Sequence, residues 1–419
     1  MKIKQLYNLY CVNYLVDTDT RKIRKGSIYF ALKGENFNGN KFATEALKKG
    51  ANYAVIDDEK YNTHPNIILV KNSLKALQKL ANFHRKQLNI PIISLTGSNG
   101  KTTTKELINV ILSKKYKTTA TTGNLNNHIG VPLTLLAMSP ETEIGIVEMG
   151  ANHLKEIDFL CKIAEPNFGY VTNFGKAHLE GFGSFEGIIK GKSELYNFLK
   201  NNRGIAFVNK DDKIQVRQSN RVNSVFFDKN SIQFIKANPF VEVQFKSTLI
   251  ESKLIGKYNY SNIAAAITIG NYFKISENHI KNAIESYTPT NNRSQIIEKG
   301  TSKIILDAYN ANPSSMLAAL ENFNQLNGTN KIVFLGDMFE LGKESNNEHQ
   351  RIAELAISYS FFKVYLIGKA FSTTSVKNAF IYNSFESFKA SNKKIKIDNT
   401  TILIKGSRGM ALERLLNLF

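Results

Sequence analysis

A short polar turn between an apolar run and a helical pattern carries the clearest chemistry in this sequence. The turn consists of Gly97, Ser98, Asn99, Gly100, Lys101, Thr102 and Thr103. Glycines let backbone N–H groups approach phosphate oxygens, a lysine can bridge terminal phosphates, and the Thr102 hydroxyl can hold a magnesium ion. ATP or GTP is therefore the implied ligand. The ordinary alternative is a Gly-Lys-Thr triplet that only caps a helix.

The segments on either side of this turn favour the phosphate-binding interpretation. Ile92, Ile93 and Leu95 suit a buried strand, and Leu107 with Ile108 begins an apolar repeat at helical spacing. Leu95 also stands where the common phosphate-loop pattern has its first glycine, so this loop is a shorter variant. The sequence predicts a strand, a phosphate loop and a helix between residues 91 and 112.

Further polar residues follow predicted strands, where parallel α/β sheets place ligand-binding groups. Glu148 ends the strand that begins near Glu143, and beside a phosphate loop such an acid is the expected partner of Thr102 on magnesium. His178 lies in the loop after the next strand, although a single histidine is more often structural. Asn259 and Asn262 open an apolar helix; they either cap it or present amide edges to an adenine.

The charge and composition exclude several classes of protein. The formal charge of +20 is spread along all 419 residues: residues 1–90 carry 16 basic and 7 acidic side chains, 91–287 carry 23 and 17, and 288–419 carry 16 and 11. Without a basic tail or an aromatic-interleaved basic stripe, we expect no nucleic-acid partner. No apolar run is long enough for a membrane span, and the two cysteines, Cys11 and Cys161, have no metal-binding spacing. We expect a cytoplasmic protein with no integral membrane segment.

The pattern of strands and helices predicts an α/β protein with three domains. Residues 1–90 read as a small α/β domain, residues 91–288 as a central parallel-sheet nucleotide-binding domain, and residues 289–419 as a Rossmann-like doubly wound domain. The third domain lacks the G-x-G-x-x-G fingerprint, so it is not expected to bind a dinucleotide. We expect a hinge in the polar segment 287–292, so that the third domain can close over the second.

Eight segments of the chain resemble, in the same order, segments of the Mur ligases of bacterial cell-wall synthesis. They are LTGSNGKTTTKE, TTGNLNNHIGVPLTLL, GIVEMGANHLKEI, VTNFGKAHLEGFGS, GKYNYSNIAAA, LDAYNANPSSM, FLGDMFELG and ILIKGSRGMALE. The run DAYNANP at 307–313 discriminates best, because family members that add diaminopimelate or lysine differ there. The resemblance covers nearly the whole chain and is strongest to the members that add D-alanyl-D-alanine.

The resemblance implies a fold and a reaction. The N-terminal domain would hold the uridine diphosphate end of the substrate, the central domain ATP, and the C-terminal domain would close over the site. A carboxylate of UDP-N-acetylmuramoyl-tripeptide would attack the γ-phosphate, and the amine of D-alanyl-D-alanine would then attack the acyl phosphate. A related ligase with another acceptor, similar to folylpolyglutamate synthase, is the second hypothesis, and an ATP-driven protein that is not a ligase is the third. We expect a monomer.

The resemblance also implies roles for individual residues. Lys101, His178 and Lys192 would be catalytic, with Lys192 carbamylated so that it becomes carboxylate-like; from its sequence context alone Lys192, like Lys190, would belong to a solvated face. Two Mg²⁺ ions would be held by Thr102, Glu148, His178 and Lys192. Asn259 and Asn262 would contact adenine, Arg293 and Asp307 the phosphate and ribose, Asn126, Asn127, His128, Asn310 and Asn312 the peptide substrate, and Thr20 and Arg21 the uridine diphosphate. Tyr258 stands where many relatives have histidine.

Overall fold

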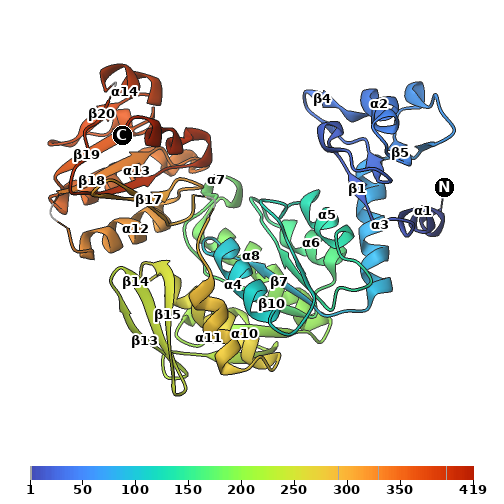
Figure 1. Cartoon of the computed structure of the whole chain (residues 1–419), viewed down its shortest axis with the longest axis horizontal. Coiled ribbons are helices and arrows are strands. Elements are labelled where there is room, and N and C mark those ends of the chain that lie inside the picture. The colour runs from blue at the N-terminus through green and yellow to red at the C-terminus, as the bar shows by residue number, and fades with distance from the viewer. Residues whose placement is uncertain (1, 291, 329, 393) are drawn as a thin grey trace.

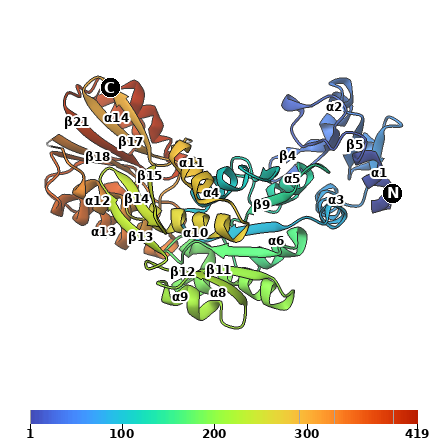
Figure 2. The same cartoon turned by 60° about the horizontal axis from the view of Figure 1, so that its bottom comes forward.

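Three α/β domains follow one another along the chain. The computed structural model describes residues 2–290, 292–328, 330–392 and 394–419; residue 291, part of the predicted hinge, lies outside them. Figures 1 and 2 both place the N-terminal and C-terminal domains on opposite sides of the central domain. The predicted α/β fold class is confirmed. None of the helices in the described ranges is long and apolar enough to cross a membrane.

The N-terminal domain is built on a parallel four-stranded sheet in the order β1-β2-β5-β6. Its strands are β1 (Val16–Asp17), β2 (Ile28–Phe30), β5 (Tyr53–Ile56) and β6 (Ile67–Leu69), with a small hairpin of β3 (Lys33–Gly34) and β4 (Phe37–Asn38). Its helices are α1 (Ile3–Tyr10), α2 (Ala43–Lys48) and α3 (Ser73–Leu88). These helices and strands form the small α/β unit that the sequence predicts for this part of the chain.

Helix α3 joins the first domain to the second. It begins where the Asn72 side chain accepts a 2.7 Å hydrogen bond from the Lys75 backbone, which satisfies a donor of the first turn. Near its end, Arg85 donates to the Ala164 carbonyl at 2.9 Å and to the Asn167 side chain at 2.8 Å. The helix that leaves the N-terminal sheet is therefore anchored on the central domain.

The central domain contains a parallel six-stranded sheet in the order β12-β11-β10-β7-β9-β8. Its strands are β7 (Ile92–Thr96), β8 (Thr118–Ala120), β9 (Ile144–Glu148), β10 (Phe168–Val171), β11 (Ile205–Asn209) and β12 (Asn223–Phe227). Ile92 packs into the core on one face, whereas Ile93 and Leu95 pack into the core on the other. Both faces are thus covered, as a parallel sheet requires.

Helices and a small second sheet complete this domain. The helices are α4 (Lys101–Leu112), α5 (Gly130–Leu136), α6 (Glu156–Ala164), α7 (Leu179–Phe182), α8 (Phe185–Asn201), α9 (Lys213–Gln218), α10 (Asn259–Tyr272) and α11 (Glu277–Ser286). The alternating residues after 230 form the antiparallel strands β13 (Ile232–Ala237), β14 (Phe240–Phe245) and β15 (Thr248–Ile255). The chain leaves β7 to either side of the sheet, so a crevice is expected at its carboxyl end.

The C-terminal domain has a six-stranded sheet in the order β16-β17-β21-β18-β19-β20. Its strands are β16 (Gln295–Lys299), β17 (Ser302–Asp307), β18 (Asn330–Gly336), β19 (Lys363–Ile367), β20 (Phe380–Tyr382) and β21 (Thr400–Lys405), and its helices α12 (Pro313–Gln325), α13 (Ser345–Ser358) and α14 (Phe385–Ser391). Strands β17, β21, β18 and β19 are parallel, as expected for a doubly wound sheet, but the edge strand β16, which was not predicted, runs antiparallel to β17.

Candidate active site

The phosphate loop turns tightly between β7 and α4. Gly97 has φ +141° and Gly100 φ +79°, conformations that side chains rarely adopt. A Cβ at Gly97 would lie 2.0 Å from Thr172 Oγ1, and one at Gly100 would lie 2.4 Å from Asn262 Oδ1. Both glycines are thus required by conformation and by space. The half-buried Lys101 folds back over the turn, where its Nζ donates to the Gly97 carbonyl at 2.8 Å.

A cavity of about 790 Å³ opens in front of this loop. Most of the predicted site residues that line the cavity belong to the central domain, and the others belong to the C-terminal domain. Of the sequence-predicted residues, the wall contains Ser98, Asn99, Gly100, Lys101, Thr102, Thr103, Asn126, Asn127, His128, Glu148, His178, Asn259, Asn262, Arg293, Asp307, Asn310 and Asn312. Side chains from more than 200 positions apart in the sequence therefore meet around one space.

The charges around the loop suit a polyanion. Burial lowers the pKa of the Lys101 ammonium; the Glu148 carboxylate opposes this effect and the neighbouring Arg293 guanidinium adds to it. The Arg293 guanidinium stacks on the Tyr309 ring, 3.7 Å from the ring centre, and this contact fixes the side chain. Lys101 and Arg293 repel each other because both carry a positive charge at the same cavity. A bound phosphate chain would offset this repulsion.

Thr102 and Glu148, the residues predicted to hold Mg²⁺ at the phosphate loop, lie side by side. The Thr102 hydroxyl donates to Glu148 Oε2 at 2.9 Å, and Asn126 Nδ2 donates to Glu148 Oε1 at 2.8 Å. Both residues are buried at the carboxyl edge of the sheet. Among the described residues no three His, Cys, Asp or Glu side chains gather into a metal-binding group. A hydroxyl and one carboxylate still fit Mg²⁺, which takes its other ligands from water and substrate phosphates.

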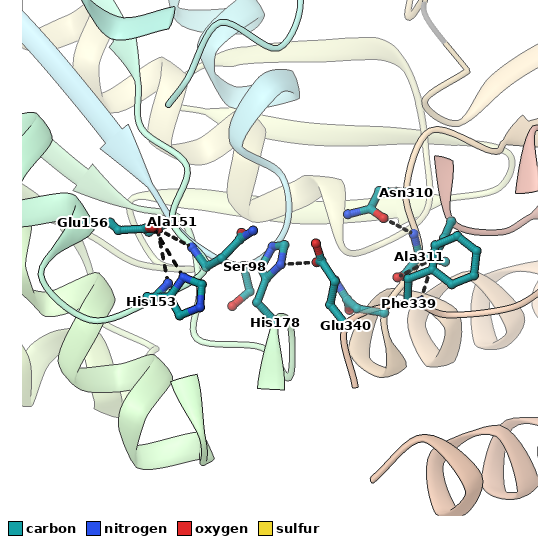
Figure 3. A network of polar contacts seen from close by, with 12 residues as sticks. Ser98, Ala151, His153, Glu156, His178, Asn310, Ala311, Phe339 and Glu340 are labelled. Carbon is teal, nitrogen blue, oxygen red and sulfur yellow. Dashed lines mark hydrogen bonds and ion pairs between the residues drawn. The ribbon is translucent and has the colours of Figure 1, made fainter. Parts of the chain in front are cut away.

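His178 lies on the cavity wall, at the junction of the two domains. Its Nδ1 faces the carboxylate of Glu340 from the C-terminal domain, and hydrogen bonding to His178 lowers the pKa of that carboxyl although partial burial opposes the effect. Figure 3 shows the two side chains facing each other, with Glu156 and His153 on the central-domain side and Phe339 on the other. The Nε2 atom of His178 is left as the nitrogen that could reach an ion.

Lys192 lies behind the cavity wall and does not line it. Its side chain is 1% exposed, Nζ donates to the Ala151 carbonyl at 3.0 Å, and the ammonium lies 5.0 Å from the Phe182 ring centre. The solvated-face interpretation of this lysine is therefore wrong, whereas Lys190, two residues earlier on α8, is exposed. Burial, with Lys101 nearby, lowers the Lys192 pKa well below its ordinary value.

The two asparagines at the start of α10 are hydrogen-bonded to each other and, through Thr104, to the first turn of α4 after the phosphate loop. Asn259 Nδ2 donates to the Ile255 carbonyl at 2.8 Å, and Asn262 Nδ2 donates to Asn259 Oδ1, also at 2.8 Å. Thr104 donates to Asn262 Oδ1 at 3.1 Å. Neither side chain caps the helix. Their contact with adenine stays a prediction.

The C-terminal domain presents a network of charges to the same cavity. Asp307 accepts from Lys405 Nζ at 2.5 Å and from the Ser294 backbone at 3.1 Å. Tyr258 joins the two domains through its hydroxyl, 2.9 Å from Ser294 Oγ. Asn310 Oδ1 accepts from the Ala311 backbone at 2.9 Å.

Lys405 and Glu340 were missed as site residues. Both lie in segments that carry the family resemblance, FLGDMFELG and ILIKGSRGMALE. A lysine that ends a strand of a doubly wound sheet is in a ligand-binding position, so the place of Lys405 could have been inferred. The place of Glu340 could not, because it depends on how the two domains dock.

Two predicted substrate residues stay outside this group. Thr20 and Arg21 form the short 3₁₀ helix η1 (Thr20–Lys22) in the N-terminal domain and do not line the cavity. Arg21 is 85% exposed and pairs with Asp19 at 2.8 Å, which also caps η1. The structure gives no support beyond exposure for a uridine diphosphate contact there.

A phosphate loop at the carboxyl edge of a parallel sheet, roofed by a second α/β domain, defines an ATP-dependent enzyme of the phosphate-loop class. Residues 14–85, 95–270 and 292–409 match, in turn, the catalytic domain, the middle domain and the glutamate ligase domain of the Mur ligases. The chain belongs to the Mur ligase family.

Individual relatives agree with this membership. The UDP-N-acetylmuramoyl-tripeptide–D-alanyl-D-alanine ligase of Buchnera aphidicola subsp. Baizongia pistaciae is 36% identical over 97% of this chain and 94% of that protein. The MurF ligase of Thermotoga maritima, crystallised with ADP, has a TM-score of 0.83, 28% identity, and coverage of 97% and 96%. The folylpolyglutamate synthase of Mycobacterium tuberculosis shares the fold at 13% identity and a TM-score of 0.62, covering 82% of this chain and 94% of that one.

Proposed function

We propose that this chain is an ATP-dependent ligase that joins D-alanyl-D-alanine to UDP-N-acetylmuramoyl-tripeptide, giving the pentapeptide, ADP and phosphate. The observation that carries the proposal is the cavity that the phosphate loop shares with Arg293, Asp307 and Asn310 of the C-terminal domain. An acyl phosphate must be kept from water, and a second domain over the phosphate loop provides that shelter. The named activity of the relatives over nearly their full length supports the same reaction.

The residues on the cavity wall suit the phosphoryl-transfer step. The tripeptide carboxylate and the γ-phosphate are both anions, so their approach needs positive charge. Lys101 and Arg293 supply it from two domains. Thr102 and Glu148 would hold a Mg²⁺ ion, which would neutralise charge on the phosphate oxygens. Asn126, Asn127 and His128 would face the muramoyl peptide, and Asn310 and Asn312 would complete the peptide site.

Lys192 has the properties that carbamylation requires. A neutral amine attacks the carbon of carbon dioxide and releases one proton, so an ammonium cannot react. Burial lowers the Lys192 pKa and so favours the neutral amine over the ammonium. The carbamate would carry a negative charge beside the wall residue Ala151, and it would support a second Mg²⁺ ion together with His178. An unmodified ammonium there would repel the ion.

The test is a coupled assay of phosphate release with separate acceptors. Release that needs both UDP-N-acetylmuramoyl-tripeptide and D-alanyl-D-alanine is the expected result, with the pentapeptide identified by mass. Release that instead needs L-glutamate and a folate would select the second hypothesis. Release without any acceptor, or stimulation by DNA or RNA, would reject the ligase assignment. The boundaries near residues 90 and 288, the adenine contacts and the uridine diphosphate contact at Thr20 and Arg21 belong to the same proposal.

A further inference from the structure

One loop of the C-terminal domain touches His178 of the central domain. The loop runs from Asp337 at the end of β18 to Ser345 at the start of α13, and includes the 3₁₀ helix η4 (Gly342–Glu344). The carboxylate of Glu340, in the middle of the loop, lies at His178 Nδ1 (Figure 3). The Glu340 carbonyl accepts a 3.2 Å hydrogen bond from the Glu180 backbone. The loop therefore contacts the start of α7 both through the Glu340 side chain and through the Glu340 backbone.

Both residues of this contact have left-handed backbone conformations. His178 has φ +55° and Glu340 has φ +62°. Such angles are uncommon for residues other than glycine, and they cluster where the surrounding structure fixes a side chain for a function. Here they aim two side chains from different domains at each other.

A buried histidine fixes the loop from the inside. His349 is fully buried; its Nε2 accepts from the Met338 backbone at 2.9 Å, and its Nδ1 lies 2.7 Å from the Ser345 carbonyl. Because a carbonyl only accepts, Nδ1 carries the hydrogen and the imidazole is neutral. One ring thus joins the two ends of the loop. Asp337, beside it, accepts from the Ala370 and Phe371 backbones at 2.9 Å each.

We propose that Glu340 is a positioning residue: when the C-terminal domain docks, its carboxylate orients the His178 ring and leaves Nε2 directed to the cavity as an ion ligand. The inference rests on the proposed function only in taking a divalent ion to bind there. Mg²⁺ prefers oxygen ligands, so an imidazole needs help to compete. A carboxylate on the opposite ring nitrogen fixes the tautomer and raises the basicity of the coordinating nitrogen. The second ion site is therefore completed only in the docked state.

The experiment compares Glu340→Ala and Glu340→Gln with Glu344→Ala, a control at an exposed acid on the same loop. Nitrogen-15 spectra of the histidine rings report the tautomer, and the His178→Gln variant identifies its signals among the seven histidines. We expect a single His178 tautomer with hydrogen on Nδ1 in the wild type and Glu344→Ala. We expect a mixture of tautomers in Glu340→Ala. Glu340→Gln keeps an acceptor oxygen and should keep the tautomer.

A second readout uses Mn²⁺ in place of Mg²⁺, titrated by electron paramagnetic resonance in the presence of ADP. Glu340→Ala should weaken the weaker Mn²⁺ site by about 10-fold or more, the usual effect of losing such a partner. The Mn²⁺ affinity of Glu340→Gln at this site should lie between those of the wild type and Glu340→Ala. The ADP affinity measured without metal should not change in either variant. His349→Ala, in a sample that still unfolds cooperatively, should act in the same direction as Glu340→Ala.

The outcomes separate this inference from the proposed function. An unchanged His178 tautomer and unchanged Mn²⁺ binding in Glu340→Ala would overturn the positioning role even if D-alanyl-D-alanine ligation is normal. Conversely, the expected spectra and Mn²⁺ titrations in a chain that uses another acceptor would leave the positioning role standing and reject only the acceptor assignment.

Discussion

Asn312 Nδ2 donates a 2.7 Å hydrogen bond to Asn99 Oδ1, joining the first residue before α12 to the phosphate loop. The same Asn312 side chain caps α12, because its Oδ1 accepts from the Ser315 backbone at 2.9 Å. Close by, the Lys176 backbone donates to Ser314 Oγ at 2.9 Å. The residue that caps α12 of the C-terminal domain therefore also contacts the phosphate loop. Docking of the third domain thus acts directly on the position of Asn99.

Lys101→Ala should abolish ligation without unfolding the protein. Within the described ranges, the ammonium donates to the Gly97 and Ser98 carbonyls of the loop, whereas during catalysis it would neutralise the transferring phosphate. We expect a loss of about 100-fold or more, as for other groups that stabilise charge in a transition state. Lys114→Ala, at an exposed lysine just after α4, is the control. Residual activity above about a tenth of wild type would contradict the role of Lys101.

Gly100→Ala should reduce nucleotide affinity more than backbone strain alone explains. The new Cβ would meet Asn262 Oδ1 at 2.4 Å, in addition to the cost of φ +79°. Gly300→Ala separates the two effects, because Gly300 also has a positive φ, +61°, but nothing lies within 4 Å of an added Cβ. We expect Gly300→Ala to lose about 1 kcal/mol of stability with normal ADP binding. Equal ADP affinity in both variants, measured by calorimetry, would argue against the close approach.

Lys192→Ala should be nearly inactive and should recover partly in acetate or propionate. A short carboxylate can enter the space that the side chain leaves and restore a negative charge beside Ala151. The control is Lys190→Ala, because Lys190 is exposed two residues earlier on the same helix. Initial rates against carboxylate concentration are the measurement. Normal activity of Lys192→Ala without added acid would remove this lysine from the mechanism.

The contact between Lys176 and Glu348 should make domain docking sensitive to acid. Burial raises the Glu348 pKa, but hydrogen bonds from Lys176 across the interface, at 2.8 Å, and from Arg351 outweigh it, so the pKa is below the ordinary 4.5. A depressed carboxyl pKa stabilises the folded state above the unfolded value and loses that effect as the pH falls through the folded value. The folded, docked chain should therefore lose stability as the pH falls below about 4.5.

The Lys176→Met variant tests this pH dependence. It leaves Glu348 buried with one cation fewer, so the Glu348 pKa should rise and the acid transition should begin at a higher pH. Thermal unfolding between pH 3 and 7 follows the transition, and Lys343→Met, at an exposed lysine in η4, is the control. Identical pH profiles for wild type and Lys176→Met would exclude Glu348 as the group responsible.

Substrate binding should draw the N-terminal domain toward the cavity. Thr20 and Arg21 lie outside the cavity wall, whereas the C-terminal domain already touches the phosphate loop through Asn312. We expect small-angle scattering to give a smaller radius of gyration with a nonhydrolysable ATP analogue and UDP-N-acetylmuramoyl-tripeptide together. The analogue alone should change it little. An unchanged radius with both ligands would leave Thr20 and Arg21 without a role in the closed site.

Local patterns in the sequence were sufficient for the elements and for much of the site. The apolar run before Gly97 and the repeat after Thr102 specify β7 and α4 because their side chains alternate between two buried faces or follow one helix stripe. Glu148 could be placed beside Thr102 because it ends a parallel strand at the sheet edge where the phosphate loop begins, and the structure brings the two side chains together. The antiparallel pairing of β16 was missed because strand direction depends on a partner, and here the partner follows after a short turn.

Contacts between elements that lie far apart in the sequence could not be predicted from such patterns. Lys192 and Lys190 look alike in sequence, and only the packing of Phe182 and Ala151 makes the first buried and the second exposed. The same holds for Glu340, whose meeting with His178 depends on the docking of two separately folded units. Both features depend on tertiary packing, which leaves no periodic pattern of residues in the sequence.

The contact between the 337–345 loop and α7 is also a seam between the two domains that lies outside the nucleotide cavity. Gly342 approaches Glu180 so closely that an added Cβ would lie 3.3 Å from Glu180 Cβ, and neither residue belongs to the cavity wall. A small molecule wedged into this seam would hold the domains apart while leaving the phosphate loop open to ATP. Because Arg293 of the C-terminal domain lines the nucleotide cavity and Asn312 contacts the phosphate loop, such a compound and ATP would weaken each other's binding without sharing a site.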